Sequence, residues 1–296
     1  MPEENPRASL PRRQLGRYIR RQREENTVLT QAEVAAAMQW SHSKYSRLER
    51  GEPGRILDRD LRELGKILEI ADEKTDAMIE LARQVAEKTW YNSFNDLIRA
   101  NFDVYMRMET EAGAMEIYRP DLVPGLFQTA DYARSLNSVY FPKDSEEEHD
   151  RRIELKLKRQ TIITRKRSPI TVDLVLHESA LHTTVGNEVT MATQLRHLAD
   201  LGTRPNISVR VLPFRSGFPL GMAVGPFVTL DFKPDPKGMA EPTVIYVESY
   251  TGDMYLEGEA DVGKYRRAFA TIQHAALDAV TSRNLLRQVA RRDSGQ

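Results

Sequence analysis

The sequence contains no cysteine, and this absence excludes several kinds of chemistry at once. A chain without thiols forms no disulfide, has no thiolate nucleophile and builds no cysteine-based zinc site. No apolar run approaches the length of a membrane span, and the first residues, MPEENPRASLP, lack the apolar core of a signal peptide. We therefore expect a cytoplasmic protein, nucleoid-associated if it binds DNA, with no membrane contact.

Net charge is also lacking, because 43 basic residues balance 43 acidic ones. Of the 296 residues, 40% are hydrophobic and 29% are charged, which is typical of a globular protein. A chain of this length can form two domains that each bury a core.

The stretch from Thr30 to Gly51, TQAEVAAAMQWSHSKYSRLERG, begins with the pattern of a short helix. Thr30 is a good N-cap, and Glu33 stands three residues later, at the spacing of a capping box. Val34 and Met38 are four residues apart and therefore lie on one helical face. These features predict an amphipathic helix that starts at residue 31.

A second short helix is predicted directly after it. Ser41 supplies another N-cap, and Tyr45 and Leu48 give this helix a buried side. Only Gln39 and Trp40 separate the two helices, so the chain must turn sharply between them. Trp40 and Tyr45 are five residues apart around this turn, which favours a place in the core over stacking on bases. Two short helices around a tight turn predict a helix-turn-helix.

The outer face of the second helix is polar and compact, as a helix that enters the major groove requires. A solvated face of an ordinary helical bundle would also be polar. Charge favours the DNA-binding interpretation: residues 7–50 contain ten basic and four acidic residues, a local charge of 10 − 4 = +6 in a neutral chain. The polar residues of this face are His42, Ser43, Lys44, Ser46, Arg47 and Arg50.

The segment LGRYIRRQREENTVLTQAEVAAAMQWSHSKYSRLERGEP resembles the amino-terminal domain of the XRE family, the Cro and lambda-repressor-like regulators. The matching motifs are L-G-x-x-I-R-x-x-R, the L-T-Q that opens the second helix, and W-S-x-S-K-x-S-R-L-E-R-G. The resemblance implies a domain that binds double-stranded DNA. Two turns depart from the family pattern: Gln39 replaces the usual glycine, and Asn26-Thr27 replaces a turn that contains glycine. Gln39 is the costlier change if its φ is positive.

The resemblance also implies roles for individual residues. Gln31 matches the position that braces the DNA backbone and the first recognition residue. Arg23 and Glu49 match an ion pair seen in XRE domains, which we interpret as structural. Three residues match positions that contact base edges: His42, Ser43 and Arg47. The remaining polar residues of this surface are assigned to the DNA backbone: Ser41, Lys44, Ser46, Arg50 and, from the first helix, Arg20.

We expect an all-α amino-terminal domain of five helices joined to a larger α+β domain. The first helix spans about residues 12–25, with Leu15 and Ile19 inward; Arg13, Arg17, Arg20 and Arg21 are expected to point outward. Asp58 is the expected N-cap of a helix over residues 58–70, and residues 72–87 form the fifth helix. The expected divisions are a flexible arm over 1–10, a DNA-binding domain over 11–88 and a partner-binding, regulatory domain over 89–296.

In the second domain, helical and strand patterns are mixed, which indicates an α+β fold. Residues 89–136 have a helical pattern that breaks at Pro120 and Pro124. A charged helix, Glu146–Arg167, follows with Ile153 and Leu157 as its apolar seam. The expected strands are Ile170–His177, Ile207–Phe214, Pro226–Phe232 and Thr243–Ser249, and the expected helices are Val189–Leu201, Gly258–Ala276 and Ala279–Ala290.

A second resemblance covers this region. VPGLFQTADYARSL, VLHESALHTTVG, QLRHLADL, ISVRVLPF, GPFVTLDF and VIYVES occur in the order typical of the carboxy-terminal domain of WhiJ-type, antitoxin-like regulators. The resemblance implies a DNA-binding regulator, most simply a repressor, whose second domain binds a small partner protein that is often encoded beside it.

Two other interpretations of the second domain stay open. One is a small-molecule sensor in which Pro213–Phe227, rich in glycine, proline and aromatic residues, lines a pocket; this segment fits a plain hairpin connection equally well. The other is a dimerisation body with residues 258–290 as the interface. We expect a homodimer in any case, because one short helix-turn-helix covers too few base pairs.

Catalysis is not indicated. His177, Glu178 and His182 lie close together after a strand, but the two histidines are five residues apart and no third ligand follows, so we expect no metal and no cofactor. Glu178 is more simply an acid near the start of a short helix. A glycosidase-like pair is conceivable among Glu109, Glu111, Glu248 and Asp253, but nothing in the sequence brings these acids together. Nucleotide-binding and serine-hydrolase motifs are missing, so an enzyme is not expected.

Overall fold

The computed structural model describes residues 10–51, 56–86, 94, 96–98, 102–233, 241–250 and 252–292. Its contacts divide the chain into two compact units: Met1–Asn92 with Ala100–Met108, and Ser93–Arg99 with Glu109–Gln296. The expected combination of an all-α helix-turn-helix domain and a larger α+β domain is confirmed.

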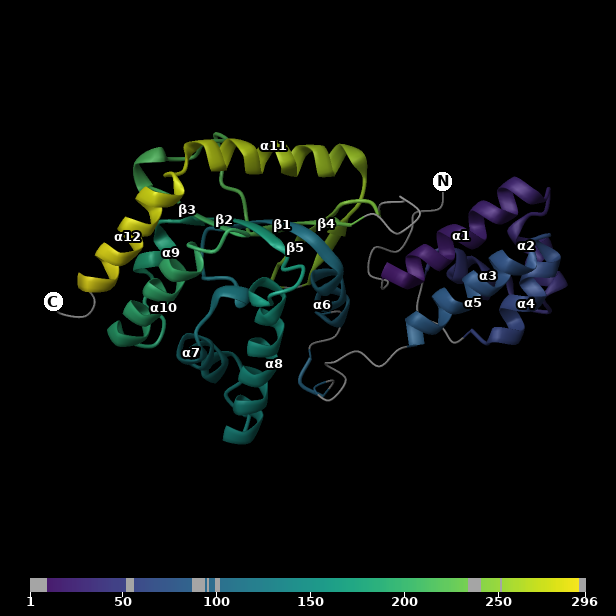
Figure 1. Ribbon diagram of the computed structural model, residues 1–296, viewed down its shortest axis with the longest axis horizontal. Helices are drawn as coiled ribbons and strands as arrows, with labels where there is room; N and C mark the ends of the chain where they lie inside the picture. The colour runs from purple at the N-terminus through teal and green to yellow at the C-terminus, as the bar shows by residue number, and fades with distance from the viewer. Residues whose placement is uncertain are drawn as a thin grey trace. The chain divides into compact units, whose positions relative to one another are not determined.

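The first unit contains the helices α1 (Leu10–Asn26), α2 (Gln31–Ala37), α3 (His42–Glu49), α4 (Asp58–Ile67) and α5 (Asp72–Ala86) (Figure 1). Their apolar faces form one core in which Ile19, Val34 and Tyr45 are fully buried. Trp40 packs on this core as expected. The predicted N-cap at Asp58 is wrong: Leu57 precedes the first turn of α4, and its N–H donates to the Asp60 carboxylate at 3.3 Å.

The second unit is built on a six-stranded sheet with the strand order β3-β2-β1-β4-β5-β6. β1 (Ala112–Arg119), β2 (Thr171–His177) and β3 (Ile207–Leu212) are parallel, and β4 (Phe227–Phe232) runs antiparallel to β1. Ile117 of β1 pairs with Leu174 of β2 on one side and with Val228 of β4 on the other. The antiparallel strands β5 (Val244–Val247) and β6 (Met254–Leu256) complete the sheet.

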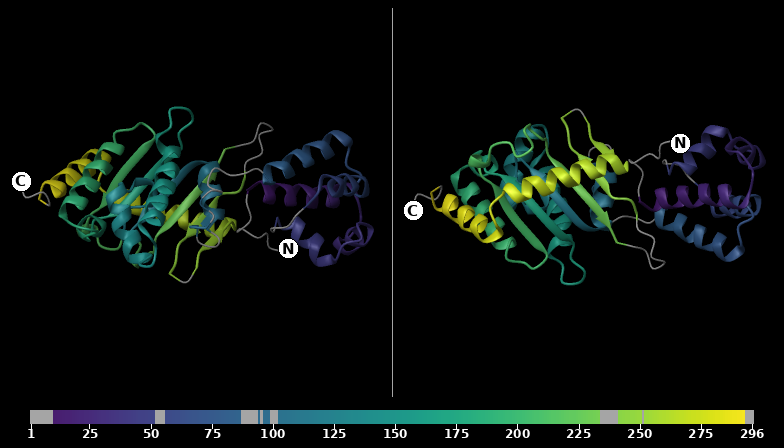
Figure 2. Two further views of the ribbon diagram at one scale, coloured as in Figure 1. Left: turned by 90° about the horizontal axis from the view of Figure 1, so that it is seen from below. Right: turned by 90° about the horizontal axis from the view of Figure 1, so that it is seen from above.

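Helices cover both faces of the sheet. α7 (Ala130–Tyr140), α8 (Glu146–Thr164) and α10 (Glu188–Leu201) lie on one face, and α11 (Glu259–Ala275) lies on the other (Figure 1). Viewed from above, α11 crosses the strands diagonally (Figure 2, right). α12 (Ala279–Arg292) packs against α10 and β3. The remaining short elements are α6 (Phe102–Glu111), α9 (Ser179–His182), η2 (Gly125–Phe127) and η3 (Phe214–Ser216).

The prediction of a helical segment over residues 89–136 is wrong for residues 112–119, because they form β1, a central strand of the sheet. The segment AGAMEIYR is rich in residues that favour helices, and propensity is only a weak prior. A central strand is also buried on both faces, so it does not show the alternation that identifies a half-buried strand. β6 was not predicted either, and it is only three residues long.

A second correction concerns α8. Ile153 is buried as expected, but Leu157 is 45% exposed and does not belong to the buried seam. The buried face instead includes Arg159, whose guanidinium donates to both oxygens of Glu109 at 2.9 and 2.8 Å. A carboxylate partner makes it possible to bury an arginine in an apolar seam.

Three glutamines hold the loop between β1 and α7. The Gln194 side chain accepts a hydrogen bond from the Thr129 N–H at 2.7 Å and donates to the Phe127 carbonyl at 2.7 Å. Gln160 donates to the Gly125 carbonyl, and Gln128 donates to the Val123 carbonyl. The motif VPGLFQT is therefore a buried loop whose backbone groups are satisfied by side chains from α8, α10 and the loop itself.

Candidate nucleic-acid interface

The turn between α2 and α3 is fixed by both of the predicted caps. Thr30 and Glu33 form a complete capping box at the start of α2, and the Ser41 hydroxyl accepts a hydrogen bond from the Lys44 N–H at 3.2 Å. Gln39 lies between the caps and has a φ of 55°, which is in the left-handed region. It is therefore the costlier of the two departures from the family pattern, because glycine adopts this conformation without strain. This strained turn lets α3 begin only a few residues after α2 ends.

A buried carboxylate joins the first three helices. Glu49, near the end of α3, is 2% exposed. Its oxygens accept hydrogen bonds from Arg23 of α1, at 2.6 and 3.2 Å, and from Gln31 of α2, at 2.6 Å. The hydrogen bond to Glu49 raises the pKa of Arg23. These hydrogen bonds fix α3 relative to α1 and α2. The Gln31 amide nitrogen donates to Glu49 and so has its partner within the protein.

The outer face of α3 presents the three residues assigned to base edges. His42, Ser43 and Arg47 are exposed and lie on the first two turns of the helix. The Arg47 Nε donates to the Ser43 carbonyl at 3.3 Å. The face combines a cation, a hydroxyl and an imidazole, which are all groups that can hydrogen-bond to base edges.

The residues assigned to the DNA backbone differ in their surroundings. Ser41 is exposed, whereas Lys44 is half-buried with its ammonium 3.6 Å from the centre of the Trp40 ring. Ser46 is buried, and its hydroxyl accepts a hydrogen bond from Arg50 Nη1 at 3.2 Å. Ser46 therefore lies behind Arg50 and orients its guanidinium.

The arginines of helix α1 differ in their exposure and in their partners. Arg20 pairs with Glu24 at 3.0 Å, and Arg21 pairs with Glu25 at 2.7 Å. Arg13 was expected to point outward, but its side chain is 1% exposed. Arg13, Arg17 and Arg21 are four residues apart and share one helical face, and exposure along this face rises from the buried Arg13 through the half-buried Arg17 to the exposed Arg21.

Gly16 belongs to the L-G-x-x-I-R-x-x-R motif, but its packing role was not predicted from the sequence. A Cβ at this position would lie 2.6 Å from the Glu49 carbonyl oxygen, 2.7 Å from that of Leu48 and 2.8 Å from the Gly51 nitrogen. Helix α1 thus touches the backbone at the end of α3 directly. The available signal was a glycine inside a helical pattern, which lowers helix stability and usually has a packing reason.

In the second unit, the residues considered as a metal or acid–base site surround an aromatic ring instead. The His177 ring packs edge-on against the Phe214 ring with 5.2 Å between the ring centres, and the His182 ring stacks on the Phe214 ring with 6.0 Å between the centres. Glu178 accepts a hydrogen bond from the Phe214 N–H at 2.7 Å. Burial lowers the pKa of His177. Within the described part of the chain, no group of three histidine or acidic side chains could hold a metal ion.

Two of the four acids considered as a glycosidase-like set form ion pairs with arginines. Glu109 is engaged by Arg159, and Glu248 accepts a hydrogen bond from Arg119 at 2.8 Å. Each of these two carboxylates therefore has an arginine partner.

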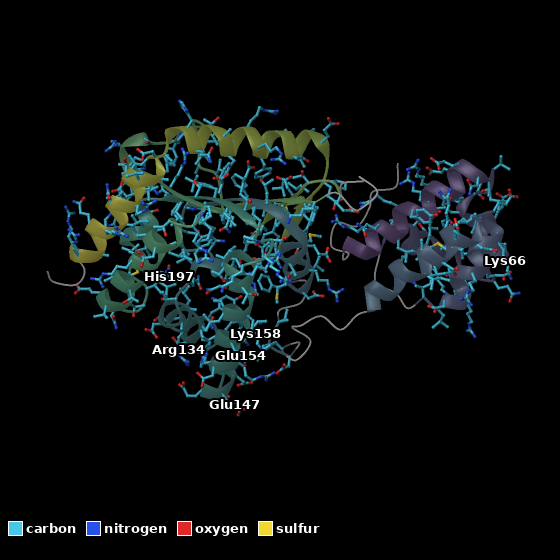
Figure 3. All side chains as sticks on the ribbon, in the orientation of Figure 1. Lys66, Arg134, Glu147, Glu154, Lys158 and His197 are labelled. Carbon is cyan, nitrogen blue, oxygen red and sulfur yellow. The ribbon has the colours of Figure 1, made fainter. Side chains whose placement is uncertain are left out.

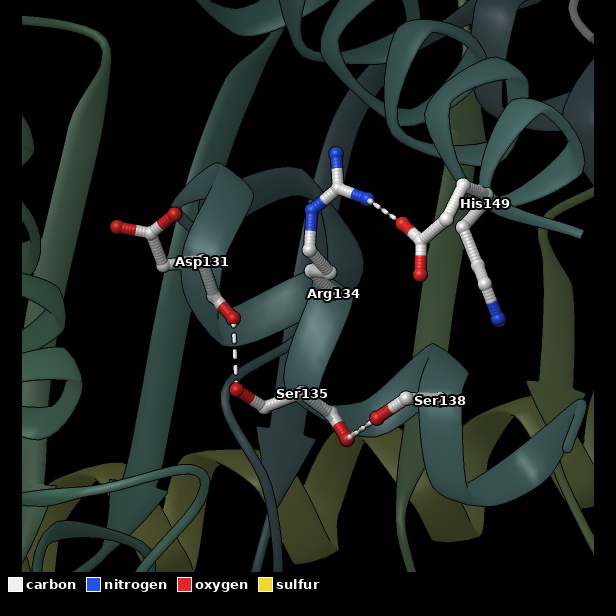
Figure 4. Close-up of a pocket in the computed structure, with 6 residues that line it drawn as sticks. Asp131, Arg134, Ser135, Ser138 and His149 are labelled. Atoms are coloured by element: carbon white, nitrogen blue, oxygen red, sulfur yellow. Dashed lines mark hydrogen bonds and ion pairs between the residues drawn. The ribbon is translucent and has the colours of Figure 1, made fainter.

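A polar hollow of about 380 Å³ lies between α7 and the start of α8 (Figure 4). Arg134 on its wall donates to Asp150 and lies 3.7 Å from Glu146. The hydroxyls of Ser135 and Ser138 donate to backbone carbonyls of α7. Because Arg134, Ser135 and Ser138 have partners within α7 and α8, we interpret the hollow as the junction of two helices and assign it no ligand.

The fold and the exposed face of α3 define a helix-turn-helix DNA-binding regulator. The chain matches the model of a helix-turn-helix domain over residues 14–78. It also matches the model of a domain of unknown function, DUF5753, over residues 102–288, which is more than half of its length. The chain belongs to the DUF5753 family.

Comparison with curated proteins and with solved structures gives no match. None of the helices in the described ranges combines the length and the apolar character needed to cross a membrane.

Proposed function

We propose that this protein is a sequence-specific transcriptional regulator of the XRE type, most simply a repressor. In this proposal a homodimer places α3 in the major groove, and the second domain, of the antitoxin-like WhiJ type, binds a small protein encoded nearby that modulates DNA binding. The protein acts in the cytoplasm, on the nucleoid, without catalysing a reaction. The arm expected over residues 1–10 lies outside the described residues except for Leu10, which begins α1, and the expected boundary between residues 88 and 89 also lies outside them.

The observation that carries this proposal is the polar face of α3 on a rigid support. His42, Ser43 and Arg47 are exposed on the outside, while the buried Glu49 on the inside is held by α1 and α2. A recognition helix must keep its base contacts within narrow limits, and side chains locked from behind provide this precision.

The other residues supply affinity. Lys44, Arg50 and Arg20 neutralise phosphates, and Ser41 contacts the backbone from the start of α3. Ser46 contributes through Arg50, to which its hydroxyl is bound. Gln31 contributes by holding Glu49, and its place at the start of α2 leaves its backbone directed at a phosphate.

A ligand-sensing regulator is the second candidate, because residues 217–224 do line a pocket. The volume of that pocket is about 100 Å³. Pockets for metabolites are usually about 300–1,000 Å³. The size therefore favours a protein partner over a metabolite.

Replacing Arg47 by alanine is expected to flatten sequence preference. Duplexes selected by the wild-type protein from a random pool should lose about 1–3 kcal/mol of binding free energy, while binding to random duplex changes much less. Lys44→Ala should weaken both kinds of duplex similarly and reduce the dependence of affinity on salt, because a lysine on a phosphate releases counterions without sequence choice. Fluorescence anisotropy at several salt concentrations measures both quantities.

Lys66→Ala is the matched control, since Lys66 is an exposed lysine on α4 that pairs with Glu63 (Figure 3). It should leave affinity and salt dependence close to those of the wild type. An equal loss of selected and random duplex in Arg47→Ala would contradict the role given to Arg47. Failure of the wild-type protein to enrich any sequence would contradict the proposed function itself.

The proposed homodimer makes a geometric prediction. Two copies of α3 related by a two-fold axis should protect half-sites about 10–10.5 base pairs apart, centre to centre, or at multiples of this spacing. Footprinting on a selected duplex, combined with the mass of the protein in solution, checks the spacing. A single unpaired half-site together with a monomeric mass would rule out the dimer.

A further inference from the structure

A small apolar pocket opens where the parallel strands β1, β2 and β3 end. The segment between β3 and β4 was considered as a hairpin, but β2 and β1 lie between these two strands, so it must cross the carboxyl end of the sheet. In crossing, it covers a pocket of about 100 Å³. Side chains from several elements line this pocket, among them Tyr118, His177, Leu212, Leu220, Val224 and Ile272.

Hydrogen bonds hold the walls of the pocket in place. Glu178 accepts a hydrogen bond from the Phe214 N–H at 2.7 Å, and the Ser179 hydroxyl donates to the Pro120 carbonyl at 2.6 Å. The Ser216 hydroxyl donates to the Ala275 carbonyl at 2.9 Å, which ties the crossing segment to the end of α11. The pocket is therefore preformed, and an occupant would not have to organise it.

The rim of the pocket exposes large apolar side chains. Phe218 is 71% exposed, Met222 67% and Phe214 55%, and the first two also line the pocket. All three belong to one short segment, whereas exposed residues such as Val139 and Val280 lie on other elements. A contiguous apolar rim around a cavity is typical of a surface that another molecule covers.

The size of the pocket selects the kind of occupant. A cavity of about 150 Å³ holds benzene, so one of about 100 Å³ takes an aliphatic group of roughly four carbon atoms. That is the size of a leucine, isoleucine or methionine side chain. The exposed rim then provides the surface on which the rest of a polypeptide lies.

Charge limits the partner further. Among the described residues, no Asp, Glu, Lys or Arg side chain lines the pocket, and Arg215 is the one charged residue of the sequence between Pro213 and Phe227. A partner peptide that lies across this rim therefore meets the cation of Arg215 and no acidic residue of the crossing segment. Its own residues next to the anchor should therefore be neutral or acidic.

We propose that this pocket is the anchor site for a partner polypeptide, which inserts one aliphatic side chain from a neutral or acidic segment. The inference rests on the proposed function only in assigning a protein partner to the second domain. It names the site and the chemistry of that partner, and it does not depend on DNA recognition.

The test uses the full-length protein and a phage-displayed library of short random peptides. Wild type, Ala223→Trp and Val280→Trp are panned in parallel. Ala223 is an exposed residue of the pocket lining, so a tryptophan there blocks the pocket; Val280 is exposed at the start of α12 and is the matched control. Enriched peptides are then synthesised, and their affinities are measured by fluorescence anisotropy, with circular dichroism to verify the fold of each variant.

We expect the enriched peptides to share one aliphatic residue, with affinity falling about 30-fold when that residue becomes alanine. Ala223→Trp should lower affinity to a similar extent and Val280→Trp should leave it unchanged. Phe218→Ser and Met222→Ser, both at exposed positions that do not threaten folding, should each weaken binding about fivefold or more.

Several results would overturn the proposal. These are the absence of any enriched peptide, and peptides that bind wild type and Ala223→Trp equally. Saturable binding of 3-methylbutan-1-ol at the pocket without any peptide would indicate a small-molecule site. Loss of self-association in Ala223→Trp, again without any peptide, would indicate that a second copy of the chain covers the rim. A failure of DNA recognition would leave all these outcomes unaffected and would count against the proposed function alone.

Discussion

Replacing Glu109 by alanine is expected to destabilise the second domain by about 3–5 kcal/mol, a large part of the stability of a typical domain. Glu109 lies at the end of α6, and its carboxylate accepts two hydrogen bonds from Arg159 of α8. The two side chains are only 2% and 10% exposed. Without the carboxylate, the buried guanidinium would lose both of its charge-assisted hydrogen bonds to Glu109.

Urea unfolding followed by circular dichroism measures this effect. Glu154→Ala is the control, because Glu154 lies on α8, the helix of Arg159, and forms an exposed pair with Lys158 one turn away (Figure 3). Exposed pairs of this kind contribute about 0.3–0.5 kcal/mol. The midpoint of unfolding should therefore move strongly for Glu109→Ala and hardly at all for Glu154→Ala.

The double variant Glu109→Leu/Arg159→Met distinguishes the net contribution of the ion pair to stability from the destabilisation caused by removing one partner. Apolar residues of similar volume often replace a buried ion pair with little loss, so this variant should recover most of the stability lost in Glu109→Ala. If the single and double variants are equally unstable, the helix position itself, and not the broken ion pair, is responsible for the loss.

The helix-turn-helix was predictable because local rules determine it. Thr30, Glu33 and Ser41 are capping residues within a few positions of the groups they satisfy, and Gln39 occupies the turn where the family usually has glycine. All of this information lies within a short stretch of sequence. Local consistency of this kind is what makes an element readable from sequence alone.

The second domain was less predictable because its determinants are distant in the sequence. β1 is a strand because β2 and β4 pair with it, and both lie more than fifty residues away. The charged helix was given Ile153 and Leu157 as its apolar seam, and only the fold brings Glu109 to the buried Arg159. The pocket beside Phe218 depends on the order of the strands, which turns a supposed hairpin into a crossing segment. A sequence pattern contains none of these pairings.

Gly16→Ala is expected to destabilise the first domain by about 3 kcal/mol, although helix propensity alone predicts a gain of about 1 kcal/mol. The added methyl group would meet three backbone atoms of residues 48, 49 and 51 at 2.6–2.8 Å. Backbone cannot rotate away as a side chain can, so the end of α3 must move relative to α1. That movement would strain the hydrogen bonds of Glu49 to Arg23 and Gln31.

Gly263→Ala is the control for the direction of the change in stability. Gly263 is also inside a helix, α11, but a Cβ there meets only the flexible end of Arg267, at 3.3 Å. This substitution should stabilise its domain by up to about 1 kcal/mol. Hydrogen exchange resolves the two domains, and protection of amides in α1 and α3 should fall only in Gly16→Ala.

The effect on DNA binding connects this contact to function. Gly16 lies far along the chain from the exposed face of α3, yet it determines how closely α3 can approach α1. If α3 shifts, His42, Ser43 and Arg47 shift with it, and selected duplexes should lose more affinity than random ones. A Gly16→Ala protein that is as stable as the wild type and binds selected duplexes equally well would show that α3 does not need its close contact with α1.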